Sequence, residues 1–332
     1  MRRPRIHLIN PMLNIGGSEL RAIELYKLLE EVADVMIWSE HEPSSKLSSQ
    51  VPIRRIRPRR GMFPWYGTMV FVGFYFTVGR WVRYSFARRR IIICNTFPNN
   101  LGSYRAMRRR LSCGTRWPIE VIYAGHEIAE AIGESGPIFS SPIDLNRFRP
   151  RVPIRRDDRF RIGRVSRDDL TKHHDGAATL YRRLLSAGCS VRIMGGTVLR
   201  HWLPETVSGL ELLPSDAEDC AAFLQGLDCF IYRTNDSWFE SFGRVIFEAM
   251  ATGLPVVAHR RGGYARFLKN GEDALLFDTD EQAFELVMRL KSNLELRQCI
   301  GRNARRRVEE MYSRSNLDEM RRFLLRTAYS TQ

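Results

Sequence analysis

Short apolar runs alternate along the whole chain with segments whose apolar residues recur at helical spacing. The apolar runs have the length of buried strands and lie at residues 5–10, 35–38, 91–94, 119–124, 160–165, 190–195, 209–213, 229–232, 255–258 and 274–277. Helical spacing follows at residues 18–31, 174–187, 216–226, 243–252 and 280–291, and from about residue 294 onward. Apolar strands that alternate with helices predict an α/β protein whose parallel sheets are covered by helices on both faces.

The chain of 332 residues is long enough for two such sheets. A segment with three prolines and many charges, residues 140–158, is typical of a boundary between domains. We therefore expect an N-terminal domain over residues 1–148 and a C-terminal domain over residues 149–312. A last helical segment, residues 313–332, would be free to pack back on the N-terminal domain.

Positive charge is concentrated in the first half of the chain. The formal net charge is +15, and residues 1–150 carry 23 Lys and Arg against 12 Asp and Glu. No Asp or Glu occurs between Glu42 and Glu120, an interval that holds 15 Arg and one Lys. This distribution indicates an anionic partner for the N-terminal half. The six cysteines have no CxxC spacing and no signal peptide is apparent, which predicts free thiols in a cytoplasmic protein.

Residues 240–258, ESFGRVIFEAMATGLPVVA, place two carboxylates around a glycine-containing helix start. Backbone N–H groups at such a start suit a diphosphate, and here they belong to Ser241, Phe242 and Gly243. Glu240 and Glu248 are eight residues apart, which is roughly 12 Å along a helix axis. Carboxylates accept hydrogen bonds from hydroxyl groups, so the pair suits the sugar and the ribose of a nucleotide diphosphate sugar. The alternative is a solvent-facing Glu248 and an ordinary loop residue at Glu240.

The same segment resembles the E-x7-E segment of retaining glycosyltransferases with the GT-B fold, the group 1 (family 4) class. Further likeness to that class lies at residues 14–29, 141–150, 260–280 and 296–317, so it is nearly continuous in the second half and interrupted in the first. The resemblance implies a GT-B fold, with two Rossmann-like doubly wound domains that face a cleft and with C-terminal helices. It also implies transfer of a sugar, with retention, from a nucleotide diphosphate sugar.

Members of that class hold the donor diphosphate with an arginine and a lysine after the first strand of the second domain. Arg167 and Lys172 have this spacing, Arg164 is an alternative to Arg167, and a surface ion pair would be the ordinary role for Arg167. The resemblance assigns Glu240 to the sugar hydroxyls and Glu248 to the ribose. The remaining residues that it places on the donor side are Gly16, Gly17 and Arg244, although the two glycines also suit a plain turn.

His126 follows a strand of the first domain, where members of the class carry a histidine that faces the sugar and the acceptor. We therefore assign His126 a catalytic role together with Glu240, against a purely structural alternative. His173 and His174 are expected to line the start of a helix. No His or Cys cluster has metal-ligand spacing, and residues 278–280 (DTD) are interpreted as a turn and helix N-cap. No metal and no cofactor other than the donor substrate are expected.

Two departures from the class affect the N-terminal domain. The segment FSSPID lacks the usual Asn-Gly, and 17 residues separate His126 from Asp144, too few for the further strand and helix of the class. The acceptor surface is therefore expected to be unusual.

Residues 61–79 carry no charge, are rich in aromatic residues and have arginine-rich flanks. Aromatic side chains at headgroup level and arginines on lipid phosphates are typical of an interfacial membrane element. The residues assigned to it are Arg57, Arg59, Arg60, Trp65, Tyr66 and Trp81. The sequence thus predicts a peripheral enzyme at the inner face of the cell membrane that acts on a glycan or lipid-linked acceptor in lipopolysaccharide, capsule or glycolipid assembly. The alternatives are a buried helix with a solvated basic rim, a soluble acceptor, an inactive donor-binding homologue and an arginine-rich nucleic-acid-binding protein.

Overall fold

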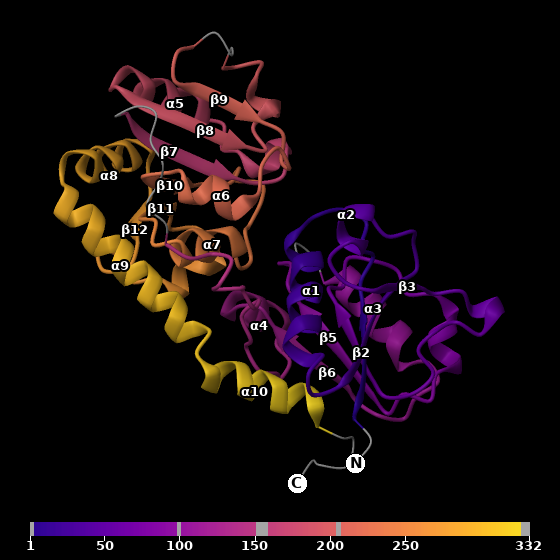
Figure 1. The fold of residues 1–332 in the computed structure, drawn as a ribbon. Helices are drawn as coiled ribbons and strands as arrows, with labels where there is room; N and C mark the ends of the chain where they lie inside the picture. The colour runs from indigo at the N-terminus through magenta and orange to yellow at the C-terminus, as the bar shows by residue number, and fades with distance from the viewer. Residues whose placement is uncertain (1–2, 98–100, 151–158, 204–206, 327–332) are drawn as a thin grey trace. The chain divides into compact units, whose positions relative to one another are not determined.

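The computed structural model describes residues 3–97, 101–150, 159–203 and 207–326, which form two compact units (Figure 1). The N-terminal unit comprises Met1–Pro142 and Tyr312–Gln332, and the C-terminal unit comprises Ile143–Met311. The boundary between the units therefore follows residue 142, whereas the sequence predicted a boundary after residue 148. The terminal segment, from Tyr312, belongs to the N-terminal unit.

The N-terminal unit is built on a six-stranded parallel sheet with the order β3-β2-β1-β4-β5-β6. Its strands are β1 (Arg5–Ile9), β2 (Asp34–Ser39), β3 (Ile53–Arg55), β4 (Thr68–Val72), β5 (Arg89–Cys94) and β6 (Ile119–Tyr123). Its helices are α1 (Gly17–Leu29), α2 (Ser45–Ser48), α3 (Gly102–Ser112), α4 (His126–Ile132) and α10 (Arg314–Leu325), with 3-10 turns η1 (Pro58–Arg60) and η2 (Arg80–Tyr84).

The C-terminal unit repeats this plan with the order β12-β11-β10-β7-β8-β9, again parallel throughout. Its strands are β7 (Phe160–Val165), β8 (Cys189–Met194), β9 (Leu210–Leu213), β10 (Cys229–Tyr232), β11 (Val256–His259) and β12 (Leu275–Phe277). Its helices are α5 (Ala177–Ser186), α6 (Cys220–Gln225), α7 (Arg244–Ala251), α8 (Asp280–Ser292) and α9 (Leu294–Met311), with 3-10 turns η3 (Leu170–Lys172), η4 (Thr197–Leu199) and η5 (Gly263–Phe267).

The strand orders fix where each unit can bind a ligand. In both sheets the strand order reverses once, between β1 and β4 and between β7 and β10. Loops at the carboxyl ends of strands on the two sides of such a point diverge and leave room for a ligand. The loops after β1 and β4 and the loops after β7 and β10 are therefore the places where each unit is expected to bind.

Apolar side chains from the strands and the covering helices form the core of each unit. In the C-terminal unit, α5 and α8 pack together on the sheet through residues such as Leu184 and Val287, which are fully buried. In the N-terminal unit, α1 and α10 contribute to one cluster with the strands. The predicted α/β class with parallel sheets is confirmed.

Arginine 89 ties the last helix to the N-terminal sheet. Its guanidinium donates to both carboxylate oxygens of Glu120, at 2.6 and 2.7 Å, and to the carbonyl oxygens of Phe323 and Leu324 at the end of α10. Because terminal carbonyl groups of a helix lack partners within the helix, this arginine caps α10. The segment after the C-terminal unit is thereby part of the N-terminal fold.

The interpretation of residues 61–79 as an interfacial element is wrong for residues 68–72. These residues form β4, which lies between β1 and β5 and is buried at every position. A central strand of a parallel sheet is apolar on both faces, which explains why this stretch lacks charge. The alternative of a buried helix is wrong for the same reason. No described helix is long and apolar enough to span a membrane.

Candidate functional site

The loop between β10 and α7 brings several of the predicted residues of the C-terminal unit to the carboxyl edge of the sheet. Gly243 is the N-cap of α7 and has a positive φ of 65°. A Cβ atom there would lie 2.8 Å from the Tyr264 ring, so a glycine is required both by the backbone and by the space. Ser241 and Phe242 are buried just before it, and the Phe242 ring stacks on Phe247 at 4.6 Å between centroids. The start of α7 is thus rigidly placed.

Lysine 172 and glutamate 240 form a buried ion pair at this edge. The Nζ atom of Lys172 lies 2.7 Å from Oε2 of Glu240, and their side chains are 9% and 18% exposed. The hydroxyl of Tyr232, at the end of β10, donates to the same oxygen at 2.8 Å. Burial acts to raise the pKa of the Glu240 carboxyl, but the Lys172 charge and these hydrogen bonds outweigh it, so the pKa lies below its ordinary value. Glu240 is therefore a carboxylate at neutral pH, held by a cation and a phenol.

Arg164 and Arg167 have different environments. The Arg164 side chain is 1% exposed, donates to the carbonyl oxygens of Arg233 (2.6 Å) and Lys172, and lies over the Tyr232 ring at 4.4 Å. Its hydrogen bonds fix the backbone on both sides of the site. The Arg167 side chain is 52% exposed and lies 3.9 Å from Asp169, a distance too long for a hydrogen bond. Of the two guanidinium groups, that of Arg167 is open to a ligand.

Glutamate 248 lies on α7 and is 4% exposed, so the alternative of a solvent-facing side chain is wrong. Its Oε1 accepts from Nε of Arg244 at 2.7 Å, one helical turn away. The Cys220 thiol lies 4.0 Å from Oε2. The estimate of 12 Å between the two glutamates assumed a continuous helix, but α7 begins at Arg244, four residues after Glu240. The helical rise therefore applies only to the second part of that interval.

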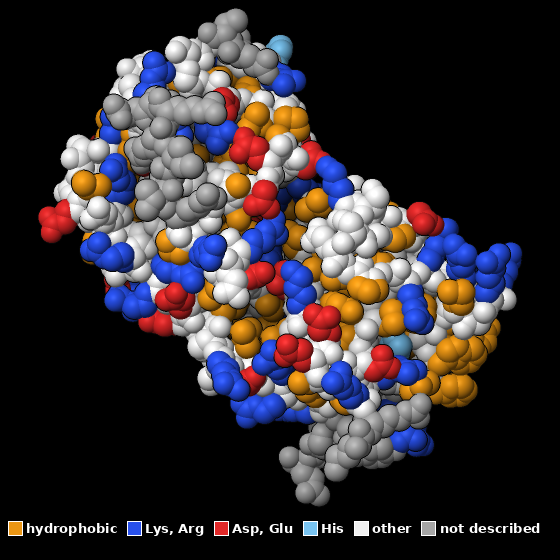
Figure 2. Space-filling model, viewed as in Figure 1, with side chains coloured by type: hydrophobic (Ala, Val, Ile, Leu, Met, Phe, Trp, Pro, Cys, Tyr) orange, Lys and Arg blue, Asp and Glu red, His pale blue; other side chains and the backbone are white. Residues whose placement is uncertain are grey.

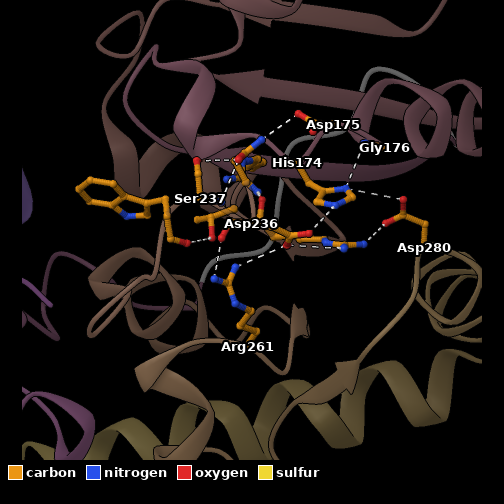
Figure 3. Close-up of polar contacts among 12 residues, drawn as sticks. His174, Asp175, Gly176, Asp236, Ser237, Arg261 and Asp280 are labelled. Atoms are coloured by element: carbon orange, nitrogen blue, oxygen red, sulfur yellow. Dashed lines mark hydrogen bonds and ion pairs between the residues drawn. The ribbon is translucent and has the colours of Figure 1, made fainter. Parts of the chain in front are cut away.

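A network of polar contacts holds the loop before Glu240 (Figure 3). Asn235 donates to Asp175 at 2.8 Å, and Arg261 lies 3.5 Å from Asp236. His174 lies 3.6 Å from Asp236 and 3.9 Å from Asp280. Among the labelled residues, Asp236 and Ser237 belong to the loop, whereas His174 and Asp175 come from the segment before α5, Arg261 from the loop after β11 and Asp280 from the start of α8.

The two adjacent histidines lie directly before α5, as expected. The ring of His173 is buried and its Nε2 lies 2.8 Å from the Gly195 carbonyl, so Nε2 carries the hydrogen. Burial, with a smaller contribution from Arg164, lowers the pKa of His173 to about 3. His174 accepts from the Gly176 N–H at 3.0 Å. Both histidines are thus structural supports of the site.

The remaining predicted site residues lie in the N-terminal unit. Gly16 is the N-cap of α1, and a Cβ atom there would lie 2.7 Å from a Glu19 carboxylate oxygen, whereas Gly17 has open space around it. His126 is exposed at the first position of α4, directly after β6. These residues lie at the carboxyl edge of the N-terminal sheet.

Sequence reasoning missed a polar cluster at the strand-order reversal of this sheet. Asn10, after β1, donates to Ser18 at 2.9 Å and to the Val72 carbonyl at the end of β4 at 2.8 Å. Tyr75, after β4, donates to Glu19 at 2.9 Å. Asn10 directly follows a predicted strand, and this position could have indicated a polar residue at the carboxyl edge of the sheet. The cluster went unnoticed because β4 was not recognised as a strand.

The residues predicted to face a membrane are only partly on the surface. Arg57, Arg59 and Arg60 are exposed, and Trp65 and Tyr66 are 43% and 47% exposed. Trp81 is 3% exposed and its Nε1 donates to Glu40 at 2.7 Å, so its assignment is wrong. A buried tryptophan whose indole N–H is bound by a carboxylate belongs to the core rather than to a membrane interface.

Other apolar side chains take its place on this surface. Met62, Tyr84 and Phe86 are 42%, 67% and 77% exposed. The Phe86 N–H donates to the Trp65 carbonyl at 2.7 Å, which joins the two segments. Figure 2 shows apolar side chains beside Lys and Arg side chains on the N-terminal unit. We call this set the aromatic–arginine surface, and it consists of Arg57, Arg59, Arg60, Met62, Trp65, Tyr66, Arg83, Tyr84 and Phe86.

Two smaller expectations are confirmed. All six cysteines are free thiols. Thr279 is the N-cap of α8 and accepts from the Gln282 N–H at 3.3 Å, while Asp280 binds Arg233 at 2.7 Å, so the DTD sequence is a turn and cap. Among the described residues, no group of three or more His, Cys, Asp or Glu could hold a metal ion.

Comparison with known families gives a match in the second half of the chain. Residues 147–307, just under half of the chain, match the model of the family described as glycosyl transferases group 1. The capsular polysaccharide biosynthesis glycosyltransferase CapM of Staphylococcus aureus is 26% identical over 181 residues, which are 52% of this chain and 47% of CapM. Spore coat protein SA of Bacillus subtilis is 31% identical over 85 residues, 25% of this chain and 22% of that protein. The chain thus spans less than half the length of these curated relatives.

Solved structures match the fold over nearly the whole chain. HepE of Anabaena, in complex with UDP and glucose, has a TM-score of 0.75 at 14% identity, with 97% of this chain and 99% of that chain covered. WaaG, a glycosyltransferase involved in lipopolysaccharide biosynthesis, has a TM-score of 0.69 at 11% identity, with 96% and 99% covered. The fold is therefore GT-B, with two Rossmann-like domains, and this prediction is confirmed.

Proposed function

We propose that the chain is a retaining glycosyltransferase that moves a sugar from a nucleotide diphosphate sugar to a membrane-associated glycan or lipid-linked acceptor. The observation that carries the proposal is the buried Lys172–Glu240 pair, 2.7 Å apart, beside the glycine-started helix α7. An ammonium group and helix N–H groups suit a diphosphate, and a charged carboxylate suits sugar hydroxyls. The group 1 match of residues 147–307 and the UDP-glucose complex of HepE support a nucleotide sugar as the donor.

The chemistry follows from where charge develops. When the bond between sugar and diphosphate breaks, negative charge grows on the diphosphate oxygens. Arg167, Lys172 and the first N–H groups of α7 would stabilise that charge, so this protein would need no metal ion for the task. Glu240 would hold the sugar hydroxyls. His126, exposed at the start of α4, would hydrogen-bond the sugar or take the proton of the acceptor hydroxyl.

The aromatic–arginine surface supports a membrane-associated acceptor. Exposed arginines attract anionic lipid phosphates, and exposed aromatic rings suit the headgroup region. The names of CapM and WaaG, a capsule enzyme and a lipopolysaccharide enzyme, are compatible with this choice. Lipopolysaccharide, capsule or glycolipid assembly at the inner face of the membrane is therefore the setting that we favour over a soluble acceptor.

The test is direct titration of the protein with UDP-, GDP-, ADP- and CDP-sugars by calorimetry, followed by hydrolysis of the best-bound donor in the presence of excess EDTA. We expect one nucleotide class to bind and slow release of its sugar to continue without divalent metal. Absence of binding to all four classes would contradict the proposed function. Loss of turnover in EDTA that Mg²⁺ or Mn²⁺ restores would contradict metal independence alone.

A further inference from the structure

Tryptophan 238 lies against both cations of the proposed diphosphate site. Its ring centroid is 4.5 Å from Nζ of Lys172 and 5.9 Å from Cζ of Arg167. A cation over the face of a tryptophan ring is attracted by the ring quadrupole. Because the ring carries no formal charge, this contact places the two cations without neutralising either of them. Two like charges are thus held beside each other, as a diphosphate requires.

The indole N–H of the same residue has no acceptor. Nε1 of Trp238 is buried and, within the described ranges, makes no hydrogen bond. A buried donor without a partner costs free energy, and indole N–H groups usually have an acceptor when buried. The indole N–H groups of Trp81 and Trp65, in contrast, donate to Glu40 and to the Gly61 carbonyl. An acceptor for Trp238 is therefore expected from a ligand that enters beside Lys172.

The backbone that carries Trp238 is fixed. Its N–H donates to the Asn235 carbonyl at 3.0 Å, and its carbonyl accepts from the Thr234 hydroxyl at 3.1 Å. Asn235 is in turn held by Asp175. Asp236 is held by His174 and Arg261, as Figure 3 shows. A ring on such a loop keeps its position before a ligand arrives. The loop therefore places Trp238 and Glu240, two residues apart, on the site together.

We propose that Trp238 is a third member of the diphosphate clamp. Its ring positions Lys172 and Arg167, and its Nε1–H donates a hydrogen bond to an oxygen of the donor diphosphate. This inference rests on the proposed function, because it takes a nucleotide diphosphate as the ligand. It assigns a role to a residue that the E-x7-E motif does not include.

Two substitutions distinguish the contribution of the aromatic ring from that of the N–H group. Trp238→Phe keeps an aromatic face over the cations and removes the donor, whereas Trp238→Leu removes both. Trp202→Phe is the matched control, since Trp202 is 44% exposed in the same unit and its ring contacts His201. Each variant is titrated by calorimetry with UDP, GDP, ADP and CDP and with the corresponding nucleosides.

We expect Trp238→Phe to weaken the best-bound nucleoside diphosphate by about tenfold to a hundredfold, as for loss of one hydrogen bond to a charged acceptor. Trp238→Leu should weaken it further by a few-fold to about thirtyfold through loss of the cation–π contacts. Affinity for the nucleoside, which lacks phosphates, should be unchanged in both variants, and Trp202→Phe should bind like the wild type. A merely structural role would reduce nucleoside and nucleoside diphosphate binding together.

Wild-type affinity for the nucleoside diphosphate in Trp238→Phe would overturn this inference while leaving the proposed function intact. Failure of the wild-type protein to bind any of the four nucleoside diphosphates would instead overturn the proposed function. A melting curve of each variant accompanies the titrations. If Trp238→Leu does not fold, Trp238→Phe still decides the question.

Discussion

The Nζ atom of Lys172 lies 2.7 Å from Oε2 of Glu240, although the two residues are 68 positions apart in the chain. The pair joins the loop after β7 to the loop after β10, across the point where the strand order of the sheet reverses. The charge of Lys172 helps to keep the Glu240 carboxyl ionised, because opposite charges interact strongly in a partly dry site. The first prediction concerns what happens when one of the two charges is removed.

Glu240→Gln should reduce sugar transfer by about tenfold to a hundredfold, the range for a hydrogen bond to a charged group. It should not weaken binding of the bare nucleoside diphosphate, because the Glu240 carboxylate would no longer compete with the diphosphate for the Lys172 ammonium group. Glu248→Gln, which changes a carboxylate buried on α7, should weaken the bare nucleotide itself. Transfer rates and calorimetry on the two variants test this. Wild-type behaviour of both would remove the two glutamates from the site.

The two arginines after β7 should give opposite results. Arg167→Ala should weaken nucleoside diphosphate binding about tenfold or more and leave the melting temperature nearly unchanged, because its side chain is half exposed. Arg164→Ala should lower the free energy of unfolding by about 2 kcal/mol or more, since it leaves two carbonyl groups near the site without their donor.

Calorimetry and urea unfolding separate these effects, with Arg302→Ala as the control because Arg302 is exposed on α9. A stable Arg164→Ala variant that has lost nucleotide binding would move the clamp from Arg167 to Arg164.

A buried histidine should make the N-terminal unit sensitive to acid. His7 in β1 accepts from Trp38 Nε1 at Nδ1 (2.9 Å) and donates from Nε2 to the Tyr66 carbonyl (2.8 Å), so the folded state holds a neutral ring. Burial, with nearby arginines as a smaller cause, lowers the pKa of His7 to about 4. The unfolded chain takes up a proton near pH 6.5, so the stability from this group is complete above that pH. It is lost as the pH falls toward 4, by about 3 kcal/mol in total.

His7→Gln removes the titration while keeping an acceptor and a donor. The free energy of unfolding of the wild type relative to this variant should therefore decline between pH 6.5 and 4. His41→Gln, at an exposed histidine, should leave the wild-type pH profile unchanged. A constant difference between the wild type and His7→Gln over this range would show that His7 does not contribute to acid sensitivity.

Much of the architecture could be read from the sequence because its strands are continuous apolar runs. The ten predicted strands all correspond to strands of the two sheets, with ends shifted by a few residues. β3 and β4 were missed for different reasons. β3 has three residues, two of them exposed arginines, and β4 lies in an aromatic stretch that also fits a membrane interface.

The site was predictable to the extent that it rests on local spacing. Gly243 and the helix after it follow from the sequence, since a glycine adopts the left-handed conformation of this N-cap without strain. The roles of Arg164, Tyr232 and Trp238 were not predictable, because they depend on contacts between segments that are distant in the chain. Trp81 was misassigned since composition does not reveal which aromatic residues of a stretch face inward.

The last prediction concerns the aromatic–arginine surface of the N-terminal unit. Each arginine near an anionic leaflet contributes about 1 kcal/mol, and the attraction fades within a Debye length of roughly 8 Å at physiological salt. We expect co-sedimentation with vesicles that contain anionic lipid, weakening as salt rises, and no co-sedimentation with neutral vesicles. Arg59→Gln/Arg60→Gln should reduce binding through charge, and Trp65→Ser/Phe86→Ser should reduce it through loss of insertion.

Matched controls come from the other unit, where Arg302→Gln/Arg306→Gln removes two exposed arginines and Leu294→Ser removes a leucine that is 56% exposed. Neither control should change vesicle binding. Duplex DNA is the competing anionic partner, and binding to it would share the salt dependence without needing Trp65 or Phe86. Tight DNA binding by a protein that ignores anionic vesicles would favour the nucleic-acid alternative. If the protein binds neither anionic vesicles nor duplex DNA, the surface would be assigned to a soluble acceptor. Its arginines would then be available to bind a glycan.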